Sequence, residues 1–300
     1  MKRALITGSA GFIGRHFVRY LIDREWDVTP LDIKYLDSLK DARKFFCDTG
    51  HYGDGHKRYD LVLHCAAHVG GRLDIENKAA FIGAYNVQLD GAMFEWALRT
   101  RPAHIVYWSS SAAYPIVLQR EQSFEYKLRE SDITLGSSSE ADFTYGWAKL
   151  VGERLAEEIK QEGLKVHVFR PFSGYGNEQD NSYPFGAFLD RVHKRADPFT
   201  VWGDGEQVRD FIHISDIIAA TMAAIEQDYS GPLNLCTGVP TSFNALAKLV
   251  TETAGYSPTI QHDRTKPVGV HYRVGDPTEM HKIWVPKVSL EEGIKRALAI

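Results

Sequence analysis

The stretch Thr7-Gly8-Ser9-Ala10-Gly11-Phe12-Ile13-Gly14 decides the fold of this chain. It lies between an apolar strand pattern, Ala4-Leu5-Ile6, and an amphipathic helix pattern over residues 12–23. A glycine-rich turn between a strand and a helix is typical of a dinucleotide site, although a turn without a ligand can have the same spacing.

The glycines follow the spacing Gly-x-x-Gly-x-x-Gly, and each predicts a separate task. We expect Gly8 to permit a tight turn, Gly11 to let the backbone approach a pyrophosphate, and Gly14 to let the helix pack close to the sheet. Phe12 and Ile13 begin the helix, whose free N–H groups would bind the phosphates.

Apolar runs of strand length alternate with helical patterns through the first half of the chain. The strands are expected at residues 4–6, 27–31, 61–64, 104–108 and 165–169, and the helices at 12–23, 78–99 and 145–162. Short apolar strands separated by helices favour a parallel sheet that is covered on both faces. We predict an α/β fold, with a Rossmann-like doubly wound parallel sheet in residues 1–172 and a return segment near 210–228. Residues 173–300, richer in Gly, Pro and aromatic residues, are expected to form a smaller mixed α/β C-terminal substrate lobe.

Composition excludes several classes of protein. The 300 residues carry a net charge of −4, which argues against nucleic acid as a partner. Cys47, Cys65 and Cys236 lie far apart, so we expect free thiols and neither disulfides nor a metal site. No signal segment precedes the first strand, and no stretch approaches the roughly 20 apolar residues of a membrane span. We therefore expect a cytoplasmic protein with no membrane partner.

Two acidic residues are candidate contacts of the adenosine half of a dinucleotide. Asp32 ends the second predicted strand, where a carboxylate can accept hydrogen bonds from the ribose. Because it would repel a 2′-phosphate, the cofactor predicted is NAD and not NADP. Asp48 follows a further predicted strand that ends before Cys47, and it is either an adenine contact or simply solvated.

A tyrosine and a lysine stand four residues apart, at Tyr145 and Lys149, and so share one helix face. A nearby ammonium favours the phenolate, which makes the tyrosine a better general base. Ser109-Ser110-Ser111 closes the strand that ends at Trp108, and a hydroxyl at that strand end can meet the phenol across a substrate. Taken alone, neither feature indicates catalysis, because Tyr-x-x-x-Lys pairs are common on ordinary helices and serines are common in turns and helix caps.

With these motifs in this order, the chain resembles the extended short-chain dehydrogenase/reductase family over essentially all its length. The branch it resembles comprises the NAD-dependent nucleotide-sugar epimerases and dehydratases. The resemblance implies that Ser110, Tyr145 and Lys149 are catalytic. Ser110 is chosen over Ser111 because the family's hydroxyl stands four residues before a tyrosine, here Tyr114, yet Ser111 stays open.

The same resemblance implies further contacts of the cofactor. Ala66 and Ala67 match the family's loop beside the cofactor. Asn86 matches the asparagine of its Asn-Val helix motif, which supports the surroundings of the catalytic tyrosine.

Residues of the second half resemble the family's clamp for a nucleotide sugar. Arg209 and Arg273 match arginines that grip the diphosphate, and a guanidinium suits phosphate oxygens. Asp276 matches a contact of the nucleoside ribose, Trp202 lies where the base would be, and Ser173 stands where many UDP-hexose epimerases have asparagine.

The reaction is inferred from groups that the chain lacks. Related dehydratases carry an acidic pair where Ser111 and Ala112 stand, and GDP-mannose 3,5-epimerases carry a cysteine in place of Ala112. What remains is 4-epimerisation through a transient 4-keto sugar. A UDP-hexose or UDP-hexuronate is favoured, and the Val69-Gly70-Gly71 loop leaves a GDP-sugar possible.

Other interpretations stay open at this point. Within the family they are a GDP-sugar epimerase and a keto-sugar reductase. From another class comes a catalytically silent NAD-binding regulator. The helices expected at 78–99 and 145–162 match a pair that the family uses for an intersubunit four-helix bundle, so a homodimer is predicted.

Overall fold

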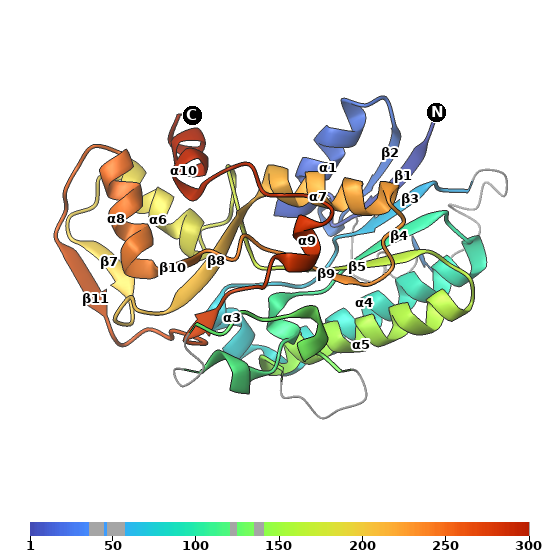
Figure 1. Ribbon diagram of the computed structural model, residues 1–300, viewed down its shortest axis with the longest axis horizontal. Coiled ribbons are helices and arrows are strands. Elements are labelled where there is room, and N and C mark those ends of the chain that lie inside the picture. Colours follow the sequence, from blue (N-terminus) through green and yellow to red (C-terminus); the bar gives the residue numbers. More distant parts are fainter. Residues whose placement is uncertain (36–44, 47–57, 121–124, 135–140, 300) are drawn as a thin grey trace.

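A parallel sheet of six strands forms the centre of the part of the protein that the structure describes (Figure 1). The computed structural model describes residues 1–35, 45–46, 58–120, 125–134 and 141–299. The strand order is β2-β1-β3-β4-β5-β9, with every pair parallel. The strands are β1 (Arg3–Thr7), β2 (Asp27–Leu31), β3 (Leu61–His64), β4 (His104–Trp108), β5 (Val166–Pro171) and β9 (Pro232–Leu235). The predicted doubly wound sheet is confirmed.

Helices cover both faces of this sheet (Figure 1). The helices α1 (Phe12–Ile22) and α7 (Ile214–Glu226) cover one face, and α4 (Ala79–Thr100) and α5 (Phe143–Gln161) cover the other. Successive side chains of a strand point to opposite faces. Ile6 therefore packs toward α1 and α7, whereas Leu5 packs toward α4 and α5.

One predicted strand is wrong. Phe45 and Phe46, which precede Cys47, have helical backbone. Both rings are buried and pack against Trp96 of α4, so they cover the sheet and do not extend it. No strand can lie between β1 and β3, because these two pair directly with each other.

The second lobe combines two small sheets with three helices. In one sheet β8 is central, flanked by β10, β12 and β6, and in the other β11 pairs with β7. Its aromatic core includes Phe188, Phe199 and Phe243. The elements are β6 (Ser173–Tyr175), α6 (Pro184–His193), β7 (Phe199–Trp202), β8 (Val208–His213), β10 (Pro240–Ser242), α8 (Phe243–Thr253), β11 (Ile260–Asp263), β12 (Tyr272–Arg273) and α10 (Leu290–Leu298). The predicted mixed lobe is confirmed.

The chain passes from the first lobe to the second and back. The helix α7 returns to pack beside α1, and β9 then adds the sixth strand next to β5. Two short helices, α3 (Arg72–Asn77) and α9 (Thr278–His281), complete the connections. The predicted return segment near 210–228 contains α7, and the sheet gains its last strand just after it.

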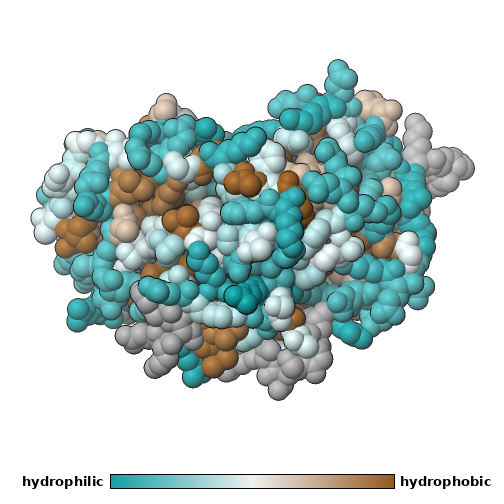
Figure 2. All heavy atoms as spheres, viewed as in Figure 1, coloured by the Kyte–Doolittle hydropathy of each residue, from teal (hydrophilic) through white to brown (hydrophobic). Residues whose placement is uncertain are grey.

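The surface and the thiols agree with an ordinary globular chain. The face in Figure 2 is mostly hydrophilic, and its hydrophobic side chains gather only in small groups. Within the described ranges, no helix combines the length and the apolar character that a membrane crossing needs. Cys65 and Cys236 are free thiols, and Cys47 lies outside the described residues.

Candidate active site

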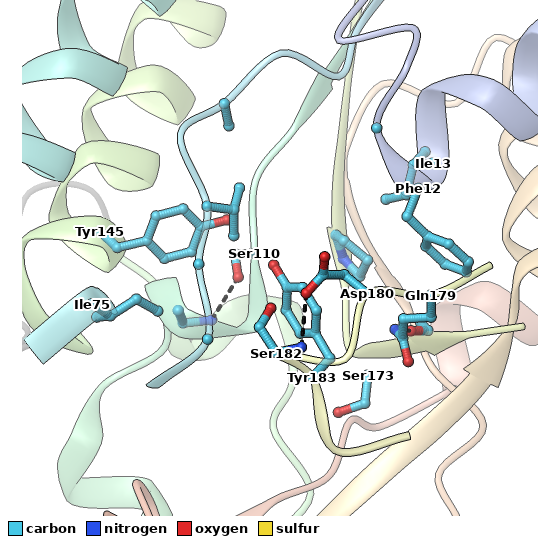
Figure 3. Close-up of a pocket in the computed structure, with 18 of the residues that line it drawn as sticks. Phe12, Ile13, Ile75, Ser110, Tyr145, Ser173, Gln179, Asp180, Ser182 and Tyr183 are labelled. Atoms are coloured by element: carbon cyan, nitrogen blue, oxygen red, sulfur yellow. Dashed lines mark hydrogen bonds between the residues drawn. The ribbon is translucent and has the colours of Figure 1, made fainter. Parts of the chain in front are cut away.

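A cleft of about 850 Å³ opens at the carboxyl ends of the sheet strands, facing the second lobe (Figure 3). The strand order reverses between β1 and β3, and ligands of open parallel sheets bind at such a point. Residues at or just after five strand ends line the cleft: Thr7, Leu31, Cys65, Trp108 and Pro171. The topology therefore explains why residues far apart in the sequence meet here.

The glycine loop forms one wall of the cleft. Gly8 has φ +64°, and a Cβ there would lie 2.6 Å from the backbone nitrogen of Ala66. A Cβ on Gly14 would lie 2.2 Å from the carbonyl oxygen of Gly8, and one on Gly11 3.1 Å from the same oxygen. Gly14 thus lets α1 pack against the loop itself, which corrects the expectation that its close contact is with the sheet.

The start of α1 supplies hydrogen-bond donors to this wall. Phe12, Ile13 and Gly14 line the cleft, and N–H groups in the first turn of a helix have no partner within the helix. Figure 3 shows Phe12 and Ile13 at this edge. A tight loop that leaves no room for side chains, followed by free N–H groups, fits the pyrophosphate of a dinucleotide.

Asp32 lies where the sequence predicts, at the end of β2 beside the loop. Its two oxygens accept hydrogen bonds from the backbone nitrogens of Ala10, at 2.9 Å, and Lys34, at 3.0 Å. The carboxylate is therefore held in place before any ribose binds. Lys34 also lines the cleft, which the sequence analysis did not anticipate.

The loop after β3 forms the floor next to the glycines. Ala66 and Ala67 line the cleft as predicted. Asn86 does not line it, because its amide is buried and bonds both backbone groups of His68, at 2.7 and 3.0 Å. Asn86 thus holds this loop from behind. Asp48 lies outside the described residues.

Ser110, Tyr145 and Lys149 converge on the middle of the cleft. In Figure 3, the phenol of Tyr145 points toward Ser110, whose Oγ accepts a hydrogen bond from the backbone nitrogen of Ala112 at 3.1 Å. That bond leaves the hydroxyl proton of Ser110 available to a substrate. A Cβ on Gly146 would lie 2.3 Å from the carbonyl oxygen of Ala112, so this glycine lets α5 approach the serines closely.

Lys149 is buried, and its ammonium lies 5.9 Å from the centre of the Tyr145 ring and 5.1 Å from that of Tyr107. The hydroxyl of Tyr107 donates to Asp90, a buried carboxylate on α4, at 2.7 Å. Burial alone would raise the pKa of Asp90, but the charge of Lys149 and the hydrogen bond from His64 lower it. Asp90 therefore compensates the buried ammonium.

A hydrogen-bonded chain connects this pair to the cofactor loop. His64 Nε2 lies 3.1 Å from Asp90 and Nδ1 lies 2.9 Å from the hydroxyl of Thr7, which itself accepts from the backbone nitrogen of Ala66 at 3.1 Å. Because an ionised carboxylate only accepts, Nε2 carries the proton and Nδ1 accepts from Thr7. The sequence analysis missed Asp90, whose position four residues after Asn86 on an apolar helix was the available signal.

Three arginines, Arg72, Arg209 and Arg273, line the substrate end of the cleft, and two of them pair with one carboxylate. Asp142 lies 3.0 Å from Arg72 and 2.8 Å from Arg273. Burial opposes ionisation, but the guanidinium groups of Arg273 and Arg72 lower the pKa of Asp142. Arg273 also donates to Gln119 at 2.5 Å.

Arg209, by contrast, has no carboxylate within 4 Å among the described residues. Its guanidinium donates to the backbone oxygens of Val208 and Val268, at 2.7 and 3.4 Å. Burial and the neighbouring charge of Arg273 lower its pKa to about 9. The charge of Asp142 offsets that of Arg209 only in part, so the guanidinium can bind an anion in the cleft. Arg72 and Asp142 were missed, because neither belongs to a recognisable motif.

The other predicted substrate contacts divide into two groups. Trp202 and Ser173 line the cleft. Asp276 is not among the lining residues, because its carboxylate bonds the nitrogen and hydroxyl of Thr278 and lies 3.4 Å from Arg129. The structure therefore does not bring Asp276 to the ligand.

The segment before α6 forms the wall opposite Tyr145, and it carries two groups that the sequence analysis missed (Figure 3). Hydrogen bonds from the side chain and the backbone nitrogen of Ser182 lower the pKa of Asp180. Burial, together with the nearby Tyr145 and Asp180, raises the pKa of Tyr183. An ionised carboxylate and a neutral phenol thus lie on the wall opposite Tyr145.

Comparison with known proteins places the chain among nucleotide-sugar enzymes. The model of the NAD dependent epimerase/dehydratase family matches residues 4–236. GDP-L-fucose synthase of Escherichia coli (strain K12) is 26% identical, over 98% of this chain and 94% of its own. A putative UDP-glucose 4-epimerase of Methanocaldococcus jannaschii is 27% identical, over 98% and 96%.

Solved structures agree. UDP-glucose 4-epimerase of Thermotoga maritima, determined with UDP-glucose, has a TM-score of 0.82 and 26% identity, covering 99% of this chain and 97% of its own. The glycine cradle, the held Asp32 and the family match together confirm NAD as the cofactor. The chain belongs to the NAD-dependent epimerase/dehydratase family.

Proposed function

We propose that the protein is a nucleotide-sugar 4-epimerase that acts on a UDP-hexose or UDP-hexuronate through a transient 4-keto sugar. The observation that carries this proposal is one cleft with Ser110, Tyr145 and Lys149 beside the glycine loop. At its other end lies Arg209, which forms no ion pair with a described carboxylate. A sugar can then lie between the phenol and the cofactor while its diphosphate reaches the arginines.

The residues divide the chemistry between them. NAD, held by the glycine loop and Asp32, would supply reversible hydride transfer at C4 of the sugar. Tyr145, as the phenolate, takes the proton of the 4-hydroxyl and later gives it back. Ser110 donates a hydrogen bond to the same sugar oxygen, and Lys149 stabilises the phenolate by Coulomb attraction. The keto sugar must rotate in the cleft between the two hydride transfers, so that the hydride would return to the opposite face of C4.

The substrate end supports a nucleoside diphosphate. Arg209 and Arg273, joined by Arg72, offer guanidinium groups that match phosphate oxygens. Trp202, which lines the same end, provides an aromatic face for the base. UDP remains the favoured nucleotide. Relatives that act on GDP-sugars, and a fucose synthase among them, keep a GDP-sugar epimerase and a keto-sugar reductase as alternatives.

A second candidate reaction is supported by the wall opposite Tyr145. Carbons next to a 4-keto group are acidic, and their inversion needs one group that removes a proton and another that supplies one. Asp180 and Tyr183 are ionisable groups that line the wall opposite Tyr145, whereas Ser111 and Ala112 carry neither a carboxyl nor a thiol. Epimerisation at C3 or C5 is therefore the alternative reaction of this cleft.

The test is incubation of the purified protein with UDP-, GDP- and dTDP-sugars in deuterated water, with products identified by NMR. The proposal expects a 4-epimer with no solvent deuterium on carbon and no net NADH at 340 nm. Deuterium at C3 or C5 would favour the second candidate, whereas stoichiometric consumption of the cofactor would indicate a reductase. If no sugar reacts although NAD binds, the silent regulator is supported.

We also propose a homodimer formed through α4 and α5. Val87, Trp147 and Val151 expose 38%, 45% and 41% of their surface on these two helices. A Cβ on Gly91 would meet no atom within 4 Å, so the same face allows a close approach. Light scattering should give twice the 33.8 kDa mass of the chain. A mass of one chain at micromolar concentration would contradict the dimer.

A further inference from the structure

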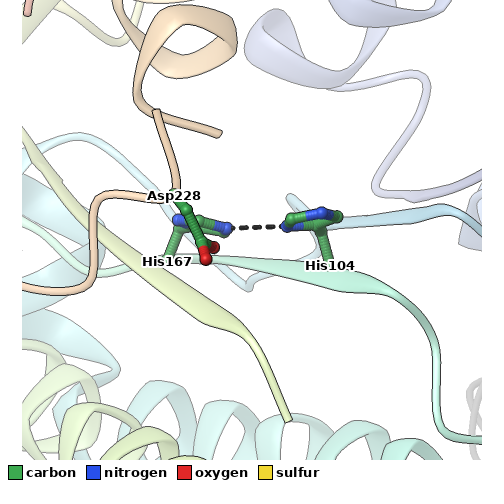
Figure 4. Close-up of side chains that lie close together, drawn as sticks. All are labelled: His104, His167 and Asp228. Carbon is green, nitrogen blue, oxygen red and sulfur yellow. Dashed lines mark hydrogen bonds between the residues drawn. The ribbon is translucent and has the colours of Figure 1, made fainter. Parts of the chain in front are cut away.

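Two histidines and an aspartate meet at the end of the sheet opposite the cleft (Figure 4). His104 is the first residue of β4, His167 the second of β5, and Asp228 lies two residues beyond α7. Cleft residues come from the carboxyl ends of these strands, so the cluster takes no part in the site described above. Nothing in the spacing of these residues suggested a metal site.

The sheet register brings the two imidazoles together. Val106 pairs with His167 across the parallel strands, so His104 and His167 project from the same face. That face is covered by α7, whose end delivers Asp228. His104 Nδ1 lies 3.0 Å from His167 Nε2, and one ligand atom from each of the three residues lies within 4.8 Å of the others.

The tautomer of His167 is fixed in the form that a metal requires. Its Nδ1 lies 2.8 Å from the carbonyl oxygen of Tyr229, and a carbonyl can only accept, so Nδ1 carries the proton. In the neutral ring, the lone pair of Nε2 then points at His104. A metal-binding histidine typically donates its other N–H to such a carbonyl.

Burial favours the neutral form of both rings, which is the form that binds a metal. Burial lowers the pKa of His167 to about 4, and burial together with Lys165 lowers the pKa of His104. Without a metal, His104 must donate its Nδ1 proton to His167. That proton can move to Nε2 of His104, which frees a second lone pair without any net loss of a proton.

We propose that His104, His167 and Asp228 bind one divalent transition-metal ion, with Zn²⁺ the best match to two imidazoles and a carboxylate. A tetrahedral Zn²⁺ with bonds of about 2.0–2.1 Å separates its ligand atoms by roughly 3.3 Å. The two nitrogens therefore need to move apart by a few tenths of an ångström. The rings must also turn so that both lone pairs meet at the ion, and the Asp228 oxygen must approach from within 4.8 Å. Because Asp228 is exposed, water can fill the fourth position and the ion has a path of entry.

Cations near the cluster limit which ions can bind. Lys165 lies 2.5 Å from Asp228 Oδ2, so Oδ1 is the oxygen that we assign to the metal. Lys160 faces His167, and Lys2 and Arg58 face His104. These positive charges weaken the binding of any cation. Mg²⁺ and Ca²⁺, which depend on oxygen ligands, lose more than an ion that imidazole binds strongly. Bound metal would tie β4 and β5 to the end of α7.

The test uses the full chain without a histidine tag, freed of metal by chelation. A Zn²⁺ titration monitored by calorimetry should give one ion per chain. Saturating Zn²⁺ should also raise the melting temperature, because the ion binds only the folded chain. His104→Gln and His167→Gln should each weaken binding at least tenfold and abolish the rise in melting temperature. His281→Gln, which changes an exposed histidine on α9, is the matched control and should behave as the wild type.

Circular dichroism of the metal-free variants checks that they fold. If His167→Gln does not fold, the more exposed His104→Gln decides the question. Equal Zn²⁺ affinity in the wild type and His104→Gln would overturn the proposal, and so would a wild type that binds no Zn²⁺ at 100 µM.

Discussion

The two ends of the cleft are built in different ways. At the cofactor end, backbone groups hold the site in place: Ala10 and Lys34 fix Asp32, and Gly14 packs on the carbonyl of Gly8. At the substrate end, charged side chains hold one another, with Asp142 between Arg72 and Arg273. The first end is therefore preformed for NAD, whereas at the second an incoming diphosphate must compete with a carboxylate of the protein.

The largest effect is expected where the two ends meet, at Tyr145. Tyr145→Phe removes the proton acceptor and leaves the ring that packs in the site. General acid–base groups contribute about 10²–10⁴-fold, so kcat should fall by that factor while the affinity for NAD is unchanged. Steady-state kinetics and a cofactor titration check both results. Undiminished turnover would remove Tyr145 from the mechanism.

Gly14→Ala should damage the cofactor end alone. The added Cβ would lie 2.2 Å from the carbonyl oxygen of Gly8, so the loop must shift. Overpacking of this kind costs about 1–3 kcal/mol, which predicts NAD binding weaker by roughly five- to 150-fold. Val285→Ala, which truncates an exposed side chain outside the cleft, is the control. Equal NAD affinity of both variants would mean that the loop is not tightly packed.

Arg209→Ala and Arg273→Ala should damage the substrate end alone. A charge-assisted hydrogen bond is worth about 1.5–3 kcal/mol, so each variant should raise KM about ten- to a hundred-fold. The value of kcat should change little if the contact is equal in the ground and transition states. Arg296→Ala, an exposed arginine on α10, should leave KM unchanged. Unchanged KM in both cleft variants would place the diphosphate elsewhere.

Asp142→Asn distinguishes two roles for this carboxylate: it competes with the diphosphate for the arginines, or it holds the arginines in position for the diphosphate. If Asp142 competes with the diphosphate, its neutralisation frees Arg72 and Arg273 and lowers KM, by roughly two- to tenfold if the gain is one net hydrogen bond of about 0.5–1.5 kcal/mol. If it positions the arginines instead, KM rises as in the arginine variants. Only a lower KM fits a substrate end where the arginines exchange Asp142 for the diphosphate.

The same variant tests a pH dependence. The folded-state pKa of Asp142 is lowered, so its ion pairs contribute stability above its unfolded pKa of about 3.9. That contribution is lost as the pH falls through the lower folded value. The wild type should therefore exceed Asp142→Asn in free energy of unfolding at pH 6, and the difference should shrink below about pH 4.

The smallest effect concerns cofactor choice. Asp32 should repel the 2′-phosphate of NADP, so the wild-type protein should bind NAD more tightly than NADP. Asp32→Ala should reduce this ratio of the two affinities. Lys34 lines the cleft beside it, and Lys34→Ala should widen the preference by removing a charge that attracts the phosphate. Fluorescence titration with both cofactors measures these ratios. Equal affinities in the wild type would contradict the assigned role of Asp32.

The cofactor end could be predicted from the sequence because its information is local. Gly8, Gly14 and Asp32 lie within one strand–helix–strand unit, and regular apolar patterns marked β2, β3 and β4 to the residue. At the substrate end, the sequence predicted four residues that line the cleft: Arg209, Arg273, Trp202 and Ser173. The ion pairs there could not be predicted, because Arg72 meets Asp142 across 70 positions and Arg273 meets it across 131. Charged residues of that kind look like ordinary surface residues until the fold brings them together. The strand predicted before Cys47 was wrong because buried aromatic residues such as Phe45 and Phe46 are compatible with a strand and also with a helix.

One measurement tests the central claim most directly, using the best UDP-sugar substrate labelled with deuterium at C4. If the protein is a 4-epimerase that keeps its cofactor bound, the 4-epimer must retain the deuterium at C4 by NMR, because the same atom is removed and returned within one site. Loss of the label from C4, or a product inverted at another carbon, would contradict the account.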